Sequence, residues 1–472
     1  MAIVIKAARS LAARLSLAGL VPALALAQPD APPPVGGGNL NPGLRTHAAA
    51  MEEFRDRKVG LSLHWGPSSL GGEEISWSRG KEIARARYDS FYLAFDPVHF
   101  DADAWMRLAQ AGGMRYVMPT SKHHDGFALW DSRVSDYDIA ATPYGKDLLR
   151  ELVDAAARHD VLFGSYYSII DWYHPDYVPY DHGGPGALYG RDDATPDFDR
   201  YLGFMKAQLR ELVEDYGARV IQLDGEWDPE WDHRLGSDLY LYLRRLNDSV
   251  LVNSRVDVGR SDLDGETGQW NTAVYAGDFD ERERMVDWIA DAETRAFTRS
   301  EVPWQAWVTI DRAQWSYNDD GSRLQSAEEI VLDLAKTIGD GGNYLINLGP
   351  RPDGTFDPAH EATVRAFGAW LRRYPEAVYG TRAGRFLDEG HYTSTRRKDD
   401  SEDFVFVLDD GLRELRLPLA GHFATGAAVA KTTGATTYGG QALESRVEGD
   451  TLVVTLQREG DMGVRVLRLV RG

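Results

Sequence analysis

The sequence predicts an α/β barrel of parallel strands followed by a smaller all-β region. Between residues 58 and 370, short apolar runs alternate with amphipathic helical stretches, as in strands joined by covering helices. The runs recur about every 40 residues, and eight such strand–helix units close a barrel. An open doubly wound sheet would place a glycine-rich turn after its first strand. The apolar run at 59–63 continues instead into His64-Trp65-Gly66.

The expected elements follow one another along the chain. Apolar runs predict strands at 59–63, 116–118, 161–163, 220–223, 250–252, 307–310 and 344–346. Amphipathic stretches predict helices at 102–111, 146–159, 198–216, 238–246 and 327–338. After residue 382 the runs are short, partly alternating and separated by turn residues, which predicts an all-β sandwich. We therefore expect the barrel over 42–377 and the sandwich over 378–472.

Residues 1–27 have the features of a secretory signal peptide. Lys6, Arg9 and Arg14 precede an apolar run that ends in Ala25-Leu26-Ala27, a small-residue cleavage site. A membrane-spanning helix needs about 20 apolar residues, and Pro22 interrupts this shorter run. Residues 28–41 are rich in proline and glycine, which predicts a flexible tether. We expect an exported protein, periplasmic or secreted, whose mature form does not span a membrane.

The composition excludes several classes of function. The chain has 52 Lys and Arg against 73 Asp and Glu, and the net charge of −21 disfavours nucleic acid and anionic membrane surfaces as partners. It has no cysteine, which excludes disulfides, thiolate metal sites and cysteine nucleophiles. The sequence leaves the oligomeric state open.

Polar and aromatic residues follow five of the predicted strands. The carboxyl ends of barrel strands carry the active site, and here they lead into His64-Trp65, Lys122 to Phe127, Tyr166-Tyr167-Ser168, Asp224 to Trp227, and Asn253-Ser254-Arg255. Side chains that bind hydroxyls or stack on rings, without a phosphate loop or a serine nucleophile, predict a sugar site. Glycoside hydrolysis needs two carboxylates, and Asp224 at a strand end is well placed to be one of them.

The same segments resemble the retaining α-L-fucosidases of glycoside hydrolase family 29. The resemblance runs in the family's order from about residue 50 to 380 and also includes Pro303-Trp304, Thr309-Ile310-Asp311, Trp315-Ser316-Tyr317 and Gly341-Gly342-Asn343-Tyr344-Leu345-Ile346-Asn347-Leu348-Gly349-Pro350. It implies an irregular (β/α)8 barrel followed by a β-sandwich. It also implies hydrolysis of terminal α-L-fucosyl residues of oligosaccharides or glycoconjugates through a covalent aspartyl intermediate, with no metal or other cofactor.

The resemblance assigns roles to individual residues. Asp224 matches the nucleophile, and Glu283 matches the acid/base of an Asp-aromatic-x-x-x-Glu segment, with Glu281 as the alternative. The residues implied to bind the sugar are His64, Trp77, His123, His124, Tyr167, Arg255 and Trp315. Adjacent strand residues point to opposite faces, so His123 and His124 can face one ligand only from an irregular segment.

Some positions depart from the family pattern. Gln222 stands where the family often has Trp, Ser76 where Glu is common before Trp77, and Gln305 where some members carry an acid/base glutamate. An amide cannot cycle a proton, so an acid elsewhere, such as Glu301, stays an alternative. Two other functions therefore remain open, a catalytically impaired fucose-binding homologue and a retaining exo-glycosidase for a related sugar. The sequence does not decide the linkage or the aglycone.

Overall fold

The computed structural model describes residues 47–177, 189–260, 275–284, 302–318, 323–388, 390–419, 432–456 and 462–471. The signal peptide and the tether predicted at 1–27 and 28–41, and the alternative acid Glu301, lie outside the described residues. Within the described ranges, no helix combines the length and the apolar character needed to cross a bilayer.

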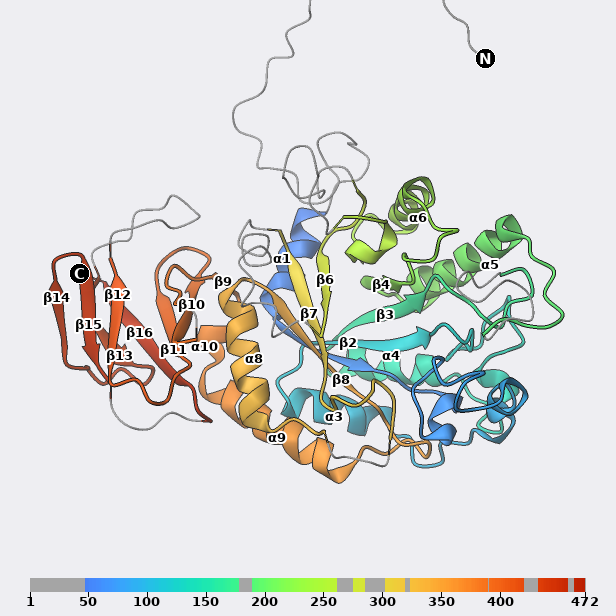
Figure 1. The fold of residues 1–472 in the computed structure, drawn as a ribbon, viewed down its shortest axis with the longest axis horizontal. Helices are drawn as coiled ribbons and strands as arrows, with labels where there is room; N and C mark the ends of the chain where they lie inside the picture. The colour runs from blue at the N-terminus through green and yellow to red at the C-terminus, as the bar shows by residue number, and fades with distance from the viewer. Residues whose placement is uncertain are drawn as a thin grey trace, which may run out of the picture. The chain divides into compact units, whose positions relative to one another are not determined.

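Eight parallel strands form the first sheet, which confirms the predicted barrel (Figure 1). They are β1 (Val59–Leu63), β2 (Tyr116–Lys122), β3 (Leu162–Ser168), β4 (Val220–Asp224), β5 (Leu251–Val252), β6 (Asp280–Glu283), β7 (Trp304–Thr309) and β8 (Asn343–Leu348). Their order in the sheet is β5-β4-β3-β2-β1-β8-β7-β6. In the described part of the chain, the edge strands β5 and β6 share no ladder, and a bridge between the adjacent residues Asn253 and Phe279 links them, which makes the barrel irregular.

The five predicted helices are present, but the helix predicted at 238–246 begins at residue 233, and the one predicted at 198–216 is α-helical to residue 210 and π-helical over Glu211–Asp215. The described α-helices are α1 (Ala48–Arg57), α2 (Arg85–Tyr88), α3 (Ala102–Ala111), α4 (Leu148–Arg158), α5 (Phe198–Arg210), α6 (His233–Leu246), α8 (Ala327–Gly339), α9 (Pro358–Arg373) and α10 (Pro375–Val378). Aspartate side chains accept backbone N–H groups at the starts of several of them, at Asp101, Asp147, Asp197 and Asp232. These caps fix where each helix begins and therefore how long the preceding loop is.

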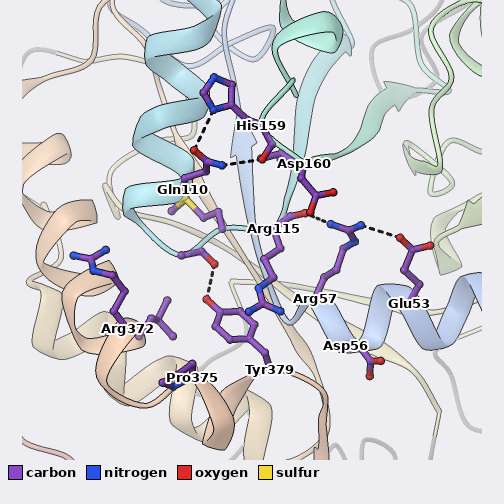
Figure 2. Close-up of a pocket in the computed structure, with 14 residues that line it drawn as sticks. Glu53, Asp56, Arg57, Gln110, Arg115, His159, Asp160, Arg372, Pro375 and Tyr379 are labelled. Atoms are coloured by element: carbon purple, nitrogen blue, oxygen red, sulfur yellow. Dashed lines mark hydrogen bonds and ion pairs between the residues drawn. The ribbon is translucent and has the colours of Figure 1, made fainter. Parts of the chain in front are cut away.

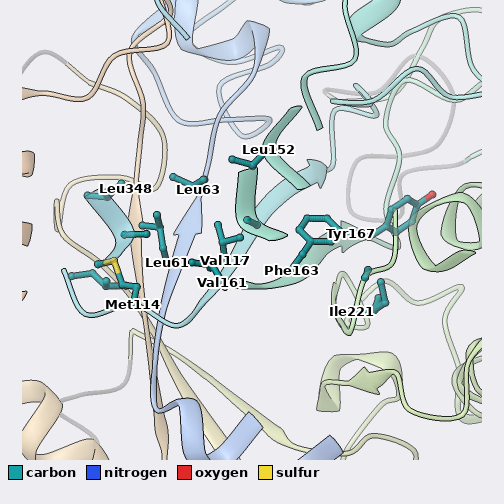
Figure 3. Packing of buried hydrophobic residues seen from close by; sticks show 14 of the residues in the cluster. Leu61, Leu63, Met114, Val117, Leu152, Val161, Phe163, Tyr167, Ile221 and Leu348 are labelled. Atoms are coloured by element: carbon teal, nitrogen blue, oxygen red, sulfur yellow. The ribbon is translucent and has the colours of Figure 1, made fainter. Parts of the chain in front are cut away.

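Alternate residues of the strands face two different hydrophobic layers. Outward-facing side chains pack between the sheet and the helices, where Figure 3 shows Leu61, Val117, Phe163, Tyr167 and Ile221. Inward-facing side chains form the barrel core, whose members include Tyr116, Met118, Tyr166, Val220, Trp307 and Leu345. Phe54 of α1 joins this inner cluster and closes the amino end of the barrel.

Glycine makes room for one of the inner aromatic residues. A Cβ at Gly60 would lie 2.2 Å from the ring of Tyr116, a distance at which atoms overlap. The Tyr116 hydroxyl donates to Oε1 of Gln305 at 2.7 Å across the barrel. A side chain at residue 60 would therefore displace an aromatic ring on which the inner packing depends.

Antiparallel strands follow the barrel, as predicted for a sandwich. The change comes between α10 and β9 (Thr381–Ala383), which is followed by β10 (Tyr392–Arg397), β11 (Asp403–Val407), β12 (Glu414–Pro418), β13 (Thr432–Thr437), β14 (Ser445–Glu448), β15 (Thr451–Thr455) and β16 (Arg465–Arg471). One sheet has the order β13-β16-β11-β10-β9 and the other β12-β15-β14. Both contribute to one hydrophobic cluster, including Val405 and Leu467 from the first sheet and Leu417 and Val454 from the second.

Candidate active site

The polar residues at the carboxyl ends of the strands meet at one cavity. The cavity has a volume of about 270 Å³ and is lined by His64, Trp77, His123, His124, Asp224, Trp227, Arg255, Glu283, Trp307 and Trp315. Eight of the nine residues that the sequence predicts for the site are among them; Tyr167 is not. Segments more than 200 residues apart in the sequence are therefore brought together, as expected for the catalytic face of a barrel.

Asp224 is the last residue of β4 and is held there by its neighbours. The side chain of Asn253 pairs with the backbone of Leu223, accepting from its N–H at 2.8 Å and donating to its carbonyl at 2.9 Å. The next residue, Gly225, has φ +100° and turns the chain sharply away from the strand. The carboxylate at residue 224 thus projects from a rigid element into the cavity.

Three side chains face the Asp224 carboxylate. The Tyr166 hydroxyl donates to Oδ2 at 2.7 Å, Arg255 forms an ion pair with Oδ1, and Nε2 of His124 lies 3.7 Å from Oδ2. Burial acts to raise the pKa of Asp224, but Arg255, His124 and Tyr166 outweigh it and lower the pKa to about 2. Asp224 is therefore an ionised, hydrogen-bonded carboxylate over the physiological pH range.

Arg255 links the two candidate catalytic carboxylates. One terminal nitrogen of its guanidinium contacts Asp224, and the other, Nη2, donates to Oε2 of Glu283 at 2.8 Å. The two carboxylates therefore lie within the span of one planar group. Burial opposes the charge of Arg255, but the surrounding carboxylates raise its pKa well above the ordinary value, so it stays cationic.

Glu281 and Gln305 lie deeper in the barrel than Glu283. Glu281 is buried, does not line the cavity, and accepts from Nε2 of Gln305 at 3.1 Å. Residues 281 and 283 are paired with 305 and 307 of β7, so Glu283 lies nearer the carboxyl end of its strand. Burial raises the pKa of Glu281 well above its usual range, which favours a neutral acid. Of the two glutamates, Glu283 is the one exposed to a ligand in the cavity.

His64 presents an unprotonated ring nitrogen to the cavity. Its Nδ1 lies 2.6 Å from Oδ1 of Asn347, and Nδ2 of Asn347 donates to the Trp315 carbonyl at 2.7 Å. The amide is thus oriented with its oxygen toward the histidine, so Nδ1 carries the proton and Nε2 is an acceptor. Burial lowers the pKa of His64 to about 3, and the ring is neutral at pH 7.

His123 and His124 both reach the cavity because β2 has ended. They lie in the turn that follows Lys122, and the register of β2 against β3 shifts between Thr120 and Lys122. Nδ1 of His123 lies 2.6 Å from the Ser76 hydroxyl. Nδ1 of His124 lies 2.6 Å from the Ser168 hydroxyl, and burial lowers its pKa to about 4. This is the irregular segment that the sequence requires for both rings to face one ligand.

The expected placement of Tyr167 is wrong, and Tyr166 takes its place. Tyr167 points outward into the layer between the sheet and the helices (Figure 3), where its hydroxyl donates to Oε1 of Gln208 at 2.8 Å. Tyr166 is the inward neighbour and contacts Asp224. Because side chains alternate along a strand, only one of these two tyrosines can face the site.

Four tryptophans form the aromatic walls of the cavity. The sequence assigns Trp77 and Trp315 to the sugar, places Trp227 in a site segment without a role of its own, and does not predict Trp307. Trp315 packs 4.5 Å from Trp307 and 5.1 Å from His64, measured between ring centroids. Glu74 fixes this wall by accepting from the backbone N–H of Trp315 at 2.8 Å. The ring faces and the polar groups together suit a molecule with an apolar face and several hydroxyls, such as a monosaccharide.

Glu226 follows the nucleophile position but is not among the residues lining the cavity. Its Oε1 is 3.9 Å from Nε of Arg255, and burial raises its pKa to about 7, against an ordinary value of 4.5. Between pH 4.5 and about 7, the Glu226 carboxyl group therefore keeps its proton in the folded protein but loses it in the unfolded chain. The contribution of Glu226 to the free energy of unfolding falls as the pH rises through this range.

Replacing Glu226 with Gln should remove this pH dependence. We expect the melting temperature of Glu226→Gln to match that of the wild type near pH 4 and to exceed it near pH 8, because the variant buries no charge there. Thermal melts across this range measure the difference. Glu214→Gln, at an exposed glutamate, is the control and should show none. A difference for Glu226→Gln that does not change with pH would contradict the assignment.

A second, larger cavity lies at the opposite end of the barrel. It has a volume of about 760 Å³, and Figure 2 shows Arg57, Arg115 and Asp160, which precede β1, β2 and β3. Arg57 is paired with Glu53, and the Arg115 guanidinium stacks 3.4 Å from the ring centroid of Tyr379. The amino end of a barrel contributes to stability, and the larger volume does not make this cavity the active site.

Among the described residues, no cluster of three His, Asp or Glu is arranged to hold a metal ion.

The fold and the cavity define a glycoside hydrolase site, with two carboxylates, neutral histidines and aromatic walls on a parallel barrel. A sequence model described as alpha-L-fucosidase matches residues 43–376, and the chain belongs to this family, glycoside hydrolase family 29. The chain is 27% identical over 391 residues to tissue alpha-L-fucosidase of Rattus norvegicus, covering 77% of this chain and 78% of the relative.

Solved structures show the same relationship. A family 29 alpha-L-fucosidase from Bacteroides thetaiotaomicron superposes with a TM-score of 0.78 at 26% identity, covering 93% of this chain and 98% of the other. A structure described as a trapped covalent intermediate of an alpha-L-fucosidase from the same organism, in complex with 2-fluoro-fucosyl fluoride, has a TM-score of 0.77 at 26% identity. That match covers 93% of this chain and 99% of the other.

Proposed function

We propose that this α-L-fucosidase is an exported, retaining enzyme that releases terminal α-L-fucosyl residues from glycans. The observation that supports retention best is the single guanidinium of Arg255 in contact with both Asp224 and Glu283. Retaining enzymes keep their two carboxyl groups about 5–5.5 Å apart, whereas inverting enzymes separate them by about 6.5–9.5 Å. One arginine in contact with both favours the shorter separation.

In the first step Asp224 forms a bond to the anomeric carbon. The low pKa of Asp224 keeps it ionised and ready to attack from the face opposite the leaving group. Glu283 gives its proton to the glycosidic oxygen as the bond to the aglycone breaks. The products are the free aglycone alcohol and a fucosyl ester of Asp224 with inverted configuration.

In the second step water hydrolyses this ester. The Glu283 carboxylate takes a proton from the water, whose oxygen attacks the anomeric carbon while the Asp224 carboxylate leaves. The two inversions return L-fucose in its original configuration, and both carboxyl groups recover their starting charge. Arg255 stays cationic and stabilises whichever carboxylate is ionised at each stage.

The cavity residues would bind the fucose hydroxyls. His64 offers an acceptor nitrogen, and the neutral His123 and His124 offer further partners within the same wall. Trp315 would pack against the apolar edge of the ring. A hydrolysis assay tests the function directly, because an aryl α-L-fucoside should release its aryl alcohol and aryl galactosides should not. An enzyme that hydrolyses only the galactosides, or neither the fucoside nor the galactosides, would reject the proposal.

Truncation of His123 separates a binding role from a structural one. Loss of a buried partner of the ligand costs about 1–3 kcal/mol, so His123→Ala should lower kcat/KM on an aryl fucoside about 5- to 150-fold with little change in melting temperature. Steady-state kinetics and a thermal melt measure the two effects. A sharp fall in melting temperature with normal turnover by the folded enzyme would make the histidine structural.

Export rests on the amino-terminal sequence. Residues 1–27 fit a cleaved signal peptide, and we infer that the mature chain begins at Gln28, the first residue of the tether over 28–41. Amino-terminal sequencing of the protein recovered from the periplasm or the medium tests this. A protein that retains its first residues and stays in the cytoplasm would contradict export.

A further inference from the structure

An exposed tryptophan stands at the mouth of the active-site cavity. Trp227 lines the cavity, yet the residue is 46% exposed. Among the described residues it is the only aromatic in the set of exposed large hydrophobic side chains. The other three tryptophans of the cavity are buried or half-buried. An apolar surface kept open beside a binding site points to a ligand that covers it.

The loop that carries Trp227 is held in one conformation. The backbone N–H of Asp228 donates to the Gly225 carbonyl at 3.1 Å, and that of Trp231 donates to the Asp228 carbonyl at 2.8 Å. The buried side chain of Asp228 accepts from the hydroxyl of Tyr177 and from the backbone of Glu230. The indole is therefore presented from a fixed turn, which lowers the entropy cost of binding a partner to it.

Trp77 supports one face of the exposed indole. The two rings are stacked, with centroids 5.9 Å apart and an angle of 28° between planes. Trp77 is held edge-on by Trp172, at 5.1 Å and 80°, and it also contacts His124 at 5.5 Å. Trp227 itself is 5.9 Å from His124 at 83°. The aromatic surface thus begins at the cavity wall and continues outward to the solvent.

We propose that Trp227, supported by Trp77, forms the binding subsite for the sugar ring to which fucose is attached. The inference rests on the proposed function. A cavity of about 270 Å³ suits one monosaccharide, and with Asp224 and Glu283 in its wall the leaving sugar must emerge at the mouth. The C–H face of a pyranose stacks on an indole. The preferred substrate class is therefore a fucosylated oligosaccharide whose next residue is a pyranose.

The test compares two substrates that share fucose and differ in the leaving group. α-L-Fucosyl fluoride has no aglycone ring, whereas a fucosyl disaccharide, chosen as the best of a panel of linkages for the wild type, has one. Trp227→Ala should lower kcat/KM for the disaccharide about 5- to 50-fold and lower that for the fluoride by a clearly smaller factor, because the fluoride has no second ring to lose its contact with the indole. Trp227→Phe should recover part of the loss. Val447→Ala, at an exposed position of β14, is the control.

Each outcome is decisive. Equal losses of kcat/KM on both substrates would mean that Trp227 acts on the catalytic residues. An unchanged kcat/KM for the disaccharide would mean that Trp227 does not contact the second sugar. Either result overturns the proposal. The inhibition constant of free L-fucose, which occupies only the cavity, should change by a smaller factor in Trp227→Ala than kcat/KM for the disaccharide does. A wild-type enzyme that cleaves no fucoside would instead reject the proposed function itself.

Discussion

Asp224→Gly should lower turnover of an aryl α-L-fucoside about a thousandfold or more, because no covalent intermediate can form. Sodium azide should restore part of the reaction by entering the space left by the carboxylate. The product should be β-L-fucosyl azide, of inverted configuration, since attack comes from the face that Asp224 occupied. Steady-state rates with and without azide, and NMR of the product, measure the result.

The control for this variant separates catalysis from stability. Asp232→Ala removes the carboxylate that caps α6, which should cost about 1 kcal/mol of stability and leave turnover near normal. Near-normal activity of Asp224→Gly would reject the nucleophile assignment. Loss of activity without azide rescue, in a folded protein, would point to a binding role.

Glu283→Ala should show an effect that depends on the leaving group. A sugar alkoxide needs protonation to leave, whereas an activated aryl oxide does not. We expect kcat/KM to fall about 100- to 10,000-fold on a fucosyl disaccharide and less than about tenfold on the aryl fucoside. One limb of the pH–rate profile should also flatten. Rates on the two substrates across pH measure both effects.

Glu281 supplies the matched comparison two residues earlier on the same strand. Its carboxyl group contacts Gln305 inside the barrel, outside the cavity. Glu281→Gln should therefore change kcat/KM by the same factor on both substrates, and its main effect should be on the melting temperature. A selective loss on the disaccharide in Glu281→Gln, with a normal Glu283→Ala enzyme, would move the acid/base assignment to Glu281.

Hydrophobic pattern predicts seven of the eight barrel strands but not β6. This strand reads Asp280-Glu281-Arg282-Glu283, with no apolar residue. Glu281 and Glu283 are directed toward the barrel interior and the cavity, while Arg282 pairs with Asp280 at 2.5 Å on the other face. A strand whose faces are occupied by ion pairs and catalytic groups has no hydrophobic period to detect. Only the resemblance to the family singles out this segment.

The site residues that the sequence misassigns or omits depend on side-chain orientations that the hydrophobic pattern does not fix. Tyr166 and Tyr167 are chemically identical, and the choice between them depends on which strand face points inward. Pairing with β4 decides which tyrosine points inward, because residue 168 is opposite Asp224 and residue 166 lies on the same face as residue 168. Trp307 lies in a predicted strand, where an aromatic residue is interpreted as part of the hydrophobic core. Trp227 follows the nucleophile position in an irregular turn, where no periodicity indicates whether a side chain is exposed.

Asp224 should form a covalent bond to fucose during turnover, and intact-protein mass spectrometry detects that bond. After incubation with 2-deoxy-2-fluoro-α-L-fucosyl fluoride, the protein should gain the mass of one fluorofucosyl group, and proteolytic mapping should place it on Asp224. Asp224→Gly should gain none. A label on another carboxylate would reject the nucleophile assignment. An enzyme that hydrolyses the reagent with inversion and never carries a label would contradict the retaining mechanism.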